Sequence, residues 1–411
     1  MAATYSRIHR RRDPHFFHRS IRPGLRTRRR LELRPVPVAM SAIVDNNNPT
    51  AIWSRIQTNL AVLGSFREKK GKGKSRGEYM KELSEDLTEY YGYLQELTEL
   101  FLTIFSPAEC VEFMDANDKP RPVVIRTNTL KTRRKDLAQT LIKRGVHLEP
   151  MAAWSKVALK ITESSVPVGA TPEYLAGHYM LQSAASQCPV LALAPEPGER
   201  VLELAAAPGG KSSYCAQLMK NSGTLVCNDL KKERHKATVA NLHRLGVSNA
   251  VVCCHDGRAF PGVMGGFDRV LLDAPCTGLG VISRDQSIKG TRTLEDVKKL
   301  AHLQKELILA AIDSVDDKKA GVVVYSTCSV AVLENEDVVQ YALDKRNVKL
   351  VDAGLPFACD AFVRCGQKRY HPSMALARRF YPHTHNMDGF FVAKLQKLSP
   401  KDKQKKRKLD E

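Results

Sequence analysis

Two cysteines follow apolar, strand-like runs in the second half of the chain. Cys276 ends the string LDAPC, and Cys328 lies in the string YSTCS. A cysteine thiolate is a strong nucleophile, and a covalent intermediate divides one difficult reaction step into two easier ones. An isolated cysteine on a buried strand is usually a small apolar packing residue. Two cysteines at the ends of neighbouring runs, one of them directly behind Asp273, instead indicate chemistry.

Methylation of cytosine at C5 is a reaction that needs these groups. C5 is a poor nucleophile until a thiolate adds to C6 and turns the ring into an enamine. A carboxylic group near ring N3 supplies the proton or hydrogen bond that accommodates the charge, and Asp273 is suited to that position. These residues alone do not rank the cysteines, because DNA cytosine methyltransferases use a Pro-Cys nucleophile, which favours Cys276.

A glycine-rich turn lies upstream, within the string VLELAAAPGGKSSY at residues 201–214. The string reads as an apolar strand, a tight turn and the start of a helix. Proteins use this arrangement for two kinds of ligand: nucleotide phosphates and S-adenosylmethionine. A phosphate loop requires the pattern G-x-x-x-x-G-K-[ST]. Ala205 occupies the position of its first glycine, so the pattern fails at one required place.

Carboxylates at the ends of the next two apolar runs favour the adenosyl ligand. Asp229 lies 19 residues after Gly210, where a carboxylate takes the ribose hydroxyls. Asp256 ends the following run, in position for an adenine edge. The helix start after the turn favours the carboxylate of the donor's methionine end. The competing interpretations are a P-loop NTPase and ordinary strand-end carboxylates.

Five short apolar runs alternate with helical patterns, which predicts a parallel sheet covered by helices on both faces. Ligands of such sheets bind beyond the C-terminal strand ends, where all of these candidate residues lie. Helices are expected at residues 231–245, closed by Gly246, and at residues 294–315. The runs are RVLEL (200–204), TLVCND (224–229), AVVCCHD (250–256), RVLLDAP (269–275) and GVVVYSTC (321–328).

A smaller α+β module is expected ahead of this sheet. Apolar residues recur at intervals of three and four from Glu78 to Phe105, which predicts an amphipathic helix with a break near Gly92. A strand at 122–130, a helix at 134–144 and two further strand-like segments follow. The expected organisation is a basic, largely disordered arm at 1–75, a helical and α+β RNA-binding module at 76–175, the sheet domain at 176–397 and a basic tail at 398–411.

The formal charge of +20 is concentrated at the two ends of the chain. Residues 1–75 contain 17 Lys or Arg against four Asp or Glu, and residues 397–411 contain seven against three. Such arms release counterions when they bind a polyanion; the alternative is a solvated tail. The patch Lys405–Lys408 favours a nuclear location, whereas the arginine-rich start resembles a mitochondrial transit peptide. A third interpretation is that translation starts at Met40.

The remaining composition excludes several classes of protein. No run of 18 apolar residues is present, so no membrane span is expected. Ten cysteines without a C-x-x-C pair argue against a zinc ribbon or a disulfide framework and fit a reducing compartment. His383 and His385 have a spacing that a metal can use, but no further ligands cluster near them. A turn is therefore favoured there, and no metal is expected.

The strings AAAPGGK, DAPC and STC together resemble the Sun/Fmu family of RNA cytosine-5 methyltransferases, over roughly residues 78–396. Longer strings such as GGFDRVLLDAPC and RRFYPHTHNMDGFFVAKL are similar to its nucleolar members that act on large-subunit ribosomal RNA. The resemblance implies an α/β, Rossmann-like class I fold that depends on S-adenosylmethionine. It further implies a monomeric enzyme of ribosome biogenesis, acting on ribosomal RNA in pre-ribosomal particles of the nucleolus. The alternatives are a non-catalytic RNA-binding assembly scaffold and a tRNA cytosine-5 methyltransferase.

The resemblance also assigns roles to individual residues. The family's nucleophile is the cysteine after threonine, which corresponds to Cys328, and the cysteine of DAPC, here Cys276, assists product release. Asp273 is expected to contact cytosine N3. The predicted RNA-binding residues, in the string RTN, are Arg126 and Asn128. The predicted cofactor-binding residues are Ala205, Ala206, Ala207, Pro208, Gly209, Gly210, Lys211, Asp229, Asp256 and Asp273.

Overall fold

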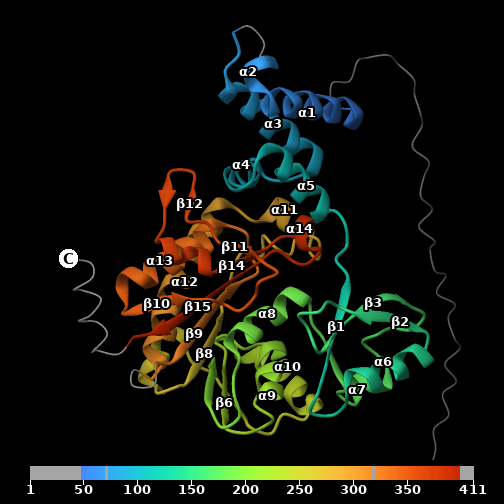
Figure 1. Ribbon diagram of the computed structural model, residues 1–411, viewed down its shortest axis with the longest axis vertical. Coiled ribbons are helices and arrows are strands. Elements are labelled where there is room, and N and C mark those ends of the chain that lie inside the picture. The colour runs from blue at the N-terminus through green and yellow to red at the C-terminus, as the bar shows by residue number, and fades with distance from the viewer. Residues whose placement is uncertain (1–47, 70–72, 317–319, 399–411) are drawn as a thin grey trace, which may run out of the picture. The chain divides into compact units, whose positions relative to one another are not determined.

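The computed structural model describes residues 48–69, 73–316 and 320–398 of the chain (Figure 1). The predictions made for Met40, for the first 47 residues and for the basic tail from residue 399 lie outside the described residues. Within the described ranges, no helix combines the length and the apolar character that crossing a bilayer requires.

The described part of the expected N-terminal arm is helical, which corrects the prediction of disorder up to residue 75. The side chain of Asn48 caps the first helix by accepting a hydrogen bond from Thr50 N. Ile52, Ile56 and Leu63 are buried in one apolar cluster with residues of the next long helix. This spacing is a helical signal that the neighbouring charge runs concealed. The first five helices are α1 (Pro49–Gly64), α2 (Phe66–Lys69), α3 (Arg76–Tyr91), α4 (Gln95–Ile104) and α5 (Pro107–Asn117).

The predicted amphipathic helix from Glu78 to Phe105 is present as α3 and α4. Gly92 separates them with φ 72°, in the left-handed region, and its N–H donates to Thr88 O. A left-handed residue ends a helix by satisfying a carbonyl of the last turn. The break near Gly92 is therefore confirmed.

A small antiparallel sheet follows, with the strand order β2-β3-β1-β4. Its strand β4 pairs with β1, with Arg126 opposite Met180. The boundary expected at residue 175 therefore cuts this sheet, because β4 lies in the segment assigned to the larger domain. Three residues are too few to produce a strand pattern in the sequence. The elements are β1 (Val123–Thr127), α6 (Arg134–Lys143), β2 (Val146–Pro150), β3 (Ala158–Ser164), α7 (Pro172–Leu175) and β4 (Tyr179–Leu181).

The larger sheet has nine strands, in the order β11-β14-β15-β9-β8-β5-β6-β7, with β10 beside β15. The five predicted runs form the parallel part, β9-β8-β5-β6-β7. Strand β15 extends the sheet antiparallel to β9, so the sheet is mixed. Its strands are β5 (Arg200–Glu203), β6 (Thr224–Asn228), β7 (Ala250–Cys253), β8 (Arg269–Asp273), β9 (Val322–Thr327), β10 (Val348–Val351), β11 (Cys359–Asp360), β14 (Arg378–Phe380) and β15 (Phe390–Lys397).

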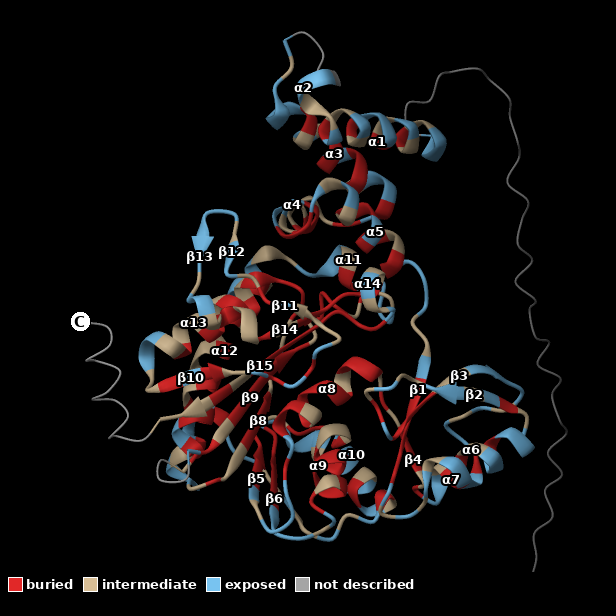
Figure 2. Cartoon of the chain, in the orientation of Figure 1, coloured by how far each residue is buried: buried red, intermediate tan, exposed pale blue. Residues whose placement is uncertain are grey.

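Helices cover both faces of the larger sheet (Figure 1). Side chains alternate between two cores: Val201 of β5 belongs to the core of α8, α9 and α10, and Leu202 belongs to the core of α12 and α13. Figure 2 shows the central strands as nearly continuously buried and the short hairpin β12–β13 as largely exposed. The predicted helices at 231–245 and 294–315 are α10 and α12. The remaining elements are α8 (Ala184–Leu193), α9 (Gly210–Leu218), α10 (Lys232–Leu245), η1 (Gly257–Gly262), α11 (Ile288–Thr291), α12 (Leu294–Ser314), η2 (Val332–Glu334), α13 (Glu336–Lys345), β12 (Arg364–Cys365), β13 (Lys368–Arg369), η3 (Pro372–Leu376) and α14 (Pro382–His385).

Candidate active site

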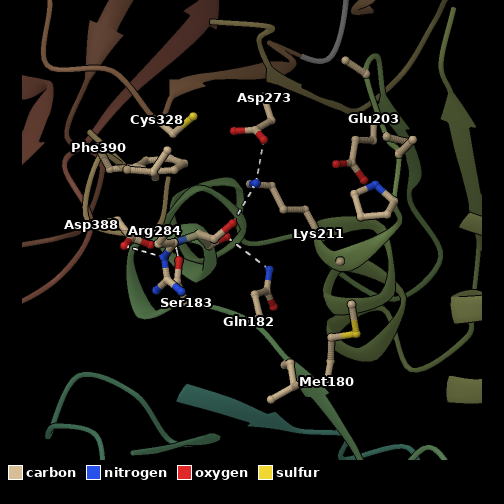
Figure 3. A pocket seen from close by; sticks show the side chains of 18 residues that line it. Met180, Gln182, Ser183, Glu203, Lys211, Asp273, Arg284, Cys328, Asp388 and Phe390 are labelled. Atoms are coloured by element: carbon tan, nitrogen blue, oxygen red, sulfur yellow. Dashed lines mark hydrogen bonds and ion pairs between the residues drawn. The ribbon is translucent and has the colours of Figure 1, made fainter. Parts of the chain in front are cut away.

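Two neighbouring cavities lie beyond the C-terminal ends of the parallel strands, where open α/β sheets bind their ligands. Each has a volume of about 360 Å³. The Lys211 pocket contains Lys211, Arg284 and Phe390 (Figure 3), and the Asp229 pocket contains Asp229 and Asp256. The residues that line both pockets are Ala205, Ala207, Asp273 and Cys328.

The turn between β5 and α9 lies at the boundary between the pockets. Every residue of the predicted turn from Ala205 to Lys211 lines a pocket except Gly209. Gly209 has φ 90°, a left-handed conformation that favours glycine. A Cβ at Gly209 would lie 3.3 Å from Thr238 Cγ2 of α10. Glycine is thus needed here for close packing between the turn and α10.

Two carboxylates of the Asp229 pocket, Asp229 and Asp256, are held in fixed orientations. Asp229 Oδ2 accepts a hydrogen bond from Ala207 N at 3.1 Å, and Oδ1 accepts from Lys231 N at 3.0 Å. Asp256 pairs with Arg258 at 2.6 Å. The hydrogen bonds from Arg258 hold the pKa of Asp256 below its usual range, so this carboxylate is ionised at neutral pH.

The walls of the Asp229 pocket suit an adenosyl group better than a phosphate. Pro275, Leu303 and Leu307 provide apolar surface for a purine, and the carboxylates of Asp229 and Asp256 face the same space. Carboxylates accept hydrogen bonds from hydroxyl and amino groups, and Arg234 and Arg258, which also line this pocket, are already paired with Asp229 and Asp256. The residues present therefore fit S-adenosylmethionine, as the sequence predicts, and they argue against a nucleoside triphosphate.

Lys211 is the centre of a hydrogen-bonded chain in its own pocket (Figure 3). Its Nζ donates to Asp273 Oδ2 at 2.6 Å and to Ser186 Oγ at 2.9 Å. Ser326 Oγ donates to the other oxygen of Asp273 at 2.7 Å. Burial works to lower the pKa of Lys211, but the charge and hydrogen bond of Asp273 outweigh burial and raise that pKa. Lys211 is therefore an ammonium that fixes the orientation of Asp273.

Glu203, at the end of β5, is a buried carboxyl in the Lys211 pocket that the sequence analysis missed. Ser212 Oγ donates a hydrogen bond to it. Burial raises the pKa of Glu203 to about 8, so this group is mainly protonated at neutral pH. Its signal in the sequence is an acidic residue inside the apolar run RVLEL.

Cys276 and Cys328 meet at the boundary between the pockets, with their Sγ atoms 3.0 Å apart. Cys328 lines both pockets, and Cys276 lines the Asp229 pocket. The contact with the Cys328 sulfur, followed by burial, raises the pKa of Cys276 well above its usual value. Cys276 therefore keeps its proton at neutral pH. Cys328 thus reaches both pockets, whereas Cys276 reaches one.

Glu334, in η2, holds the backbone around Cys276. This carboxyl is fully buried, and its Oε1 accepts hydrogen bonds from Thr277 N at 2.9 Å and from Gln304 Nε2 at 3.0 Å. Gln304 Nε2 also donates to Pro275 O at 2.8 Å. The residues before and after Cys276 are thereby fixed by one buried group.

Asn335 does the same for the backbone around Cys328. Its Nδ2 donates to Ser329 O at 2.9 Å, and its Oδ1 accepts from Thr327 Oγ1 at 2.6 Å. Thr327 and Ser329 flank Cys328 in the chain. Two consecutive residues, Glu334 and Asn335, therefore set the positions of both cysteine loops.

Replacement of Glu334 by alanine is expected to lower the methylation rate about tenfold or more, because each buried donor left unpaired costs about 1–3 kcal/mol and the Cys276 loop is released. Glutamine at the same position is expected to restore most of the rate, since its amide oxygen accepts from Thr277 N and its amide donates to the threonine hydroxyl. Single-turnover assays measure both effects. Leu395→Ala, a core truncation in β15, controls for loss of stability alone, and a wild-type rate for Glu334→Ala would contradict the positioning role.

Arg126, which the sequence analysis assigned to RNA, is fully buried between the small sheet and α9. One terminal nitrogen donates to Gly210 O at 2.6 Å, and the other donates to Ser213 Oγ at 2.8 Å. The guanidinium also lies 4.7 Å from the centre of the Tyr214 ring. Burial lowers the pKa of Arg126 to about 10, which still leaves it charged at neutral pH.

Asn128 is also buried, and its Nδ2 donates to Gly177 O at 2.9 Å and to Leu245 O at 2.7 Å. The structure thus corrects the assignment of both residues. Neither Arg126 nor Asn128 presents its side chain to RNA, and Arg126 supports the turn at Gly210. A buried charge persists only where hydrogen bonds satisfy it, and the bonding groups come from segments that the RTN string does not reveal.

Comparison with known proteins agrees with this geometry. Residues 190–396 match the model of the family described as 16S rRNA methyltransferase RsmB/F, and residues 105–168 match the ferredoxin-like domain of RsmF/B-like methyltransferases. A solved structure, a methyltransferase homolog protein from Pyrococcus horikoshii, has a TM-score of 0.70 and 36% identity, covering 77% of this chain and 99% of that chain.

Two relatives illustrate the range of sequence identity. The 25S rRNA (cytosine-C(5))-methyltransferase nop2 of Schizosaccharomyces pombe is 58% identical over 354 residues, which cover 85% of this chain and 58% of that protein. The chain spans about half the length of such eukaryotic relatives. The tRNA (cytosine(49)-C(5))-methyltransferase of Pyrococcus abyssi is 36% identical, covering 78% of this chain and 98% of that protein. With half of its length matched by the family model and an archaeal relative matched almost from end to end, the chain belongs to the RsmB/F methyltransferase family, as its DAPC and STC strings predict.

Proposed function

We propose that the protein is an S-adenosylmethionine-dependent RNA cytosine-C5 methyltransferase that acts on large-subunit ribosomal RNA. The observation that carries the proposal is the position of Cys328. Its side chain lines both pockets, 3.0 Å from Cys276 and beside the Lys211–Asp273 pair. A nucleophile at the junction of a donor pocket and a base pocket is what C5 methylation requires.

The Lys211 pocket is the proposed site of the target cytosine. Phe390 offers a planar face there, and Lys211 and Asp273 offer polar groups for a ring edge. Both faces of the C5–C6 bond must be reached, one by a sulfur and one by the donor, so the nucleotide leaves its stack before it reacts. When bound in the Asp229 pocket, S-adenosylmethionine supplies an activated methyl group.

Cys328 starts the proposed reaction. Its thiolate sulfur forms a bond to C6, and the electrons of the C5–C6 double bond move into the ring, where Asp273 passes to N3 a proton from the Lys211 ammonium to which it is bonded. C5 then takes up the methyl group. Water takes the proton from C5, and N3 returns its proton to the Lys211–Asp273 pair. The C5–C6 double bond re-forms as the bond from C6 to the Cys328 sulfur breaks, which releases the thiolate. Cys276, whose pKa is raised, keeps a thiol hydrogen that stabilises the departing thiolate.

The proposed substrate follows from the relatives. The eukaryotic proteins of 50–58% identity are named 25S, 26S or 28S rRNA cytosine-C5 methyltransferases. We therefore infer action on pre-ribosomal particles in the nucleus and nucleolus, with a role in ribosome biogenesis. A monomeric enzyme is part of the same proposal. A tRNA substrate is the second candidate, because the archaeal tRNA enzyme matches along 98% of its length.

Bisulfite sequencing of ribosomal RNA and tRNA, from cells with and without the gene, tests the proposal. We expect 5-methylcytosine to disappear from a site in large-subunit ribosomal RNA and to return with the wild-type gene but not with Cys328→Ala. Loss confined to tRNA would support the second candidate. An unchanged map, with ribosome assembly restored equally by Cys328→Ala, would contradict both and favour an assembly scaffold.

A further inference from the structure

Arg284 brings a charged group to the Lys211 pocket that the proposed reaction steps do not use. Its Nε donates to Asp388 Oδ1 at 2.7 Å, and Asp388 is 3% exposed. The two residues lie side by side in Figure 3. The terminal nitrogens Nη1 and Nη2 donate no hydrogen bond within the described residues. The side chain of Arg284 is 43% exposed, so these donors are accessible from the pocket.

Backbone contacts fix the Arg284 and Asp388 segments relative to Cys328. Gly389 N donates to Gly280 O at 2.7 Å, and Gly280 N donates to Cys328 O at 2.9 Å. A Cβ at Gly280 would lie 2.0 Å from Gly389 O, so the two backbones touch. The segments that carry Arg284, Asp388 and Cys328 are therefore joined by backbone hydrogen bonds into one rigid unit, which places the Arg284 guanidinium at a fixed position relative to the proposed nucleophile.

The charges around this unit favour an anionic ligand. Arg121 lines a small cavity together with Arg284 and Asp388, and its Nη1 donates to Pro382 O and Asn386 Oδ1. Burial lowers the pKa of Arg121, the charge of Asp388 works to raise it, and the charge of Arg284 lowers it further. Two arginines thus face one buried carboxylate. The Lys211 ammonium, by contrast, is matched by Asp273. The excess positive charge lies at Arg284, beside the base pocket.

A guanidinium whose Nε is already bonded keeps its two terminal nitrogens as a planar donor pair. Such a pair matches two oxygens of a phosphate in distance and direction. A nucleotide that enters the Lys211 pocket brings a phosphate on each side of its sugar. We infer that Arg284, oriented by Asp388, binds a backbone phosphate that flanks the target cytidine. The inference rests on the proposed function and names the group that holds the nucleotide while its base reacts.

Arg284→Gln tests the role of the charge. We expect its KM for RNA to rise about tenfold or more, as for the loss of a charged hydrogen bond, with kcat and the affinity for S-adenosylmethionine little changed. The slope of log KM against log salt is expected to fall by about 0.7–1. The matched control is Arg292→Gln, which removes the same charge from an exposed residue that lines neither pocket. Equal effects of the two variants would overturn the inference.

Methylphosphonate substitution identifies the group bound. Short RNAs with one cytidine carry a neutral methylphosphonate at the linkage 5′ or 3′ to it. At one of these linkages we expect the wild-type enzyme to lose as much affinity as Arg284→Gln loses on unmodified RNA, and Arg284→Gln to lose nothing further. Additive losses at both linkages, or none, would overturn the inference.

The same RNAs separate this inference from the proposed function. Fluorescence anisotropy with S-adenosylhomocysteine present measures RNA affinity without methyl transfer. If Arg284 and one linkage are coupled in this binding assay, but the same RNAs are not methylated when S-adenosylmethionine is supplied, the phosphate contact would be upheld and the proposed reaction rejected. If the RNAs are methylated but Arg284 and the linkages show no coupling in binding, the proposed reaction would be upheld and the phosphate contact rejected.

Discussion

Replacing Cys328 with alanine is expected to abolish methyl transfer and the covalent RNA adduct together. The thiolate of Cys328 is the atom that activates C5, and alanine offers no alternative nucleophile. The fold should persist, because the change removes one sulfur from a half-buried side chain at the boundary between two pockets. Denaturing gels of enzyme mixed with RNA detect the adduct, and transfer of a labelled methyl group measures the activity.

Cys276→Ala is expected to give the opposite result on the same gel. Without the thiol 3.0 Å from the Cys328 sulfur, the departing thiolate loses its hydrogen-bond donor and release slows, so the adduct accumulates. Cys254→Ala, which removes an exposed thiol that lines neither pocket, should behave as wild type. Accumulation with Cys328→Ala and no adduct with Cys276→Ala would reverse the assignment and make Cys276 the nucleophile.

Asp273→Asn is expected to lower kcat by about 10²–10⁴-fold, the usual contribution of a positioned general acid or base. Asparagine keeps the shape of the side chain but cannot carry a proton from Lys211 to N3. Ser326→Ala removes a hydrogen bond to Asp273 and keeps the carboxyl, so its loss should be near tenfold or below. Single-turnover rates separate these outcomes. A rate for Asp273→Asn within about tenfold of wild type would remove Asp273 from the chemistry.

The Asp273→Asn variant should also change the way in which Tm depends on pH. In the wild type, Asp273 raises the pKa of Lys211, so the pair stabilises the fold fully at every pH below the unfolded pKa of lysine, and this effect is lost only as pH rises through the raised pKa of the folded state. In Asp273→Asn, burial alone acts on Lys211 and lowers its pKa. The Tm deficit of the variant should therefore be largest near pH 7 and shrink as pH rises toward 10. A deficit independent of pH would mean that Lys211 is not charged in the wild type.

Periodicity and strand order made much of this site predictable. The five apolar runs became β5, β6, β7, β8 and β9, and their C-terminal ends meet at one edge because the strands are parallel. That topology brings Asp273, Cys276 and Cys328 together. The Gly92 break and the Gly246 cap were also readable, since a left-handed residue that ends a helix is usually glycine.

The burial of particular charged side chains could not be predicted from the sequence. Arg126 is bonded to groups 84 and 87 residues away in the chain, and the buried carboxylate of Asp388 is bonded to Arg284 across 104 residues. A local pattern places arginine on the surface by default, and only the assembled fold supplies the partners that reverse this. The antiparallel strand β15 escaped prediction for a related reason: its position beside β9 depends on a long return path, and no sequence repeat records it.

Strand β4 determines where the small sheet can be separated from the larger domain. It completes the small sheet and leads directly into Gln182, whose side chain accepts a hydrogen bond from Arg126 and which lines the Lys211 pocket. A module transplanted with its boundary at residue 175 would lack β4, its last strand. It would also leave the buried Arg126 guanidinium without its Gln182 partner. Chimeras between relatives should therefore join beyond Gln182 and carry Arg126 with its α9 partners. The small sheet and one wall of the Lys211 pocket therefore form a single structural unit.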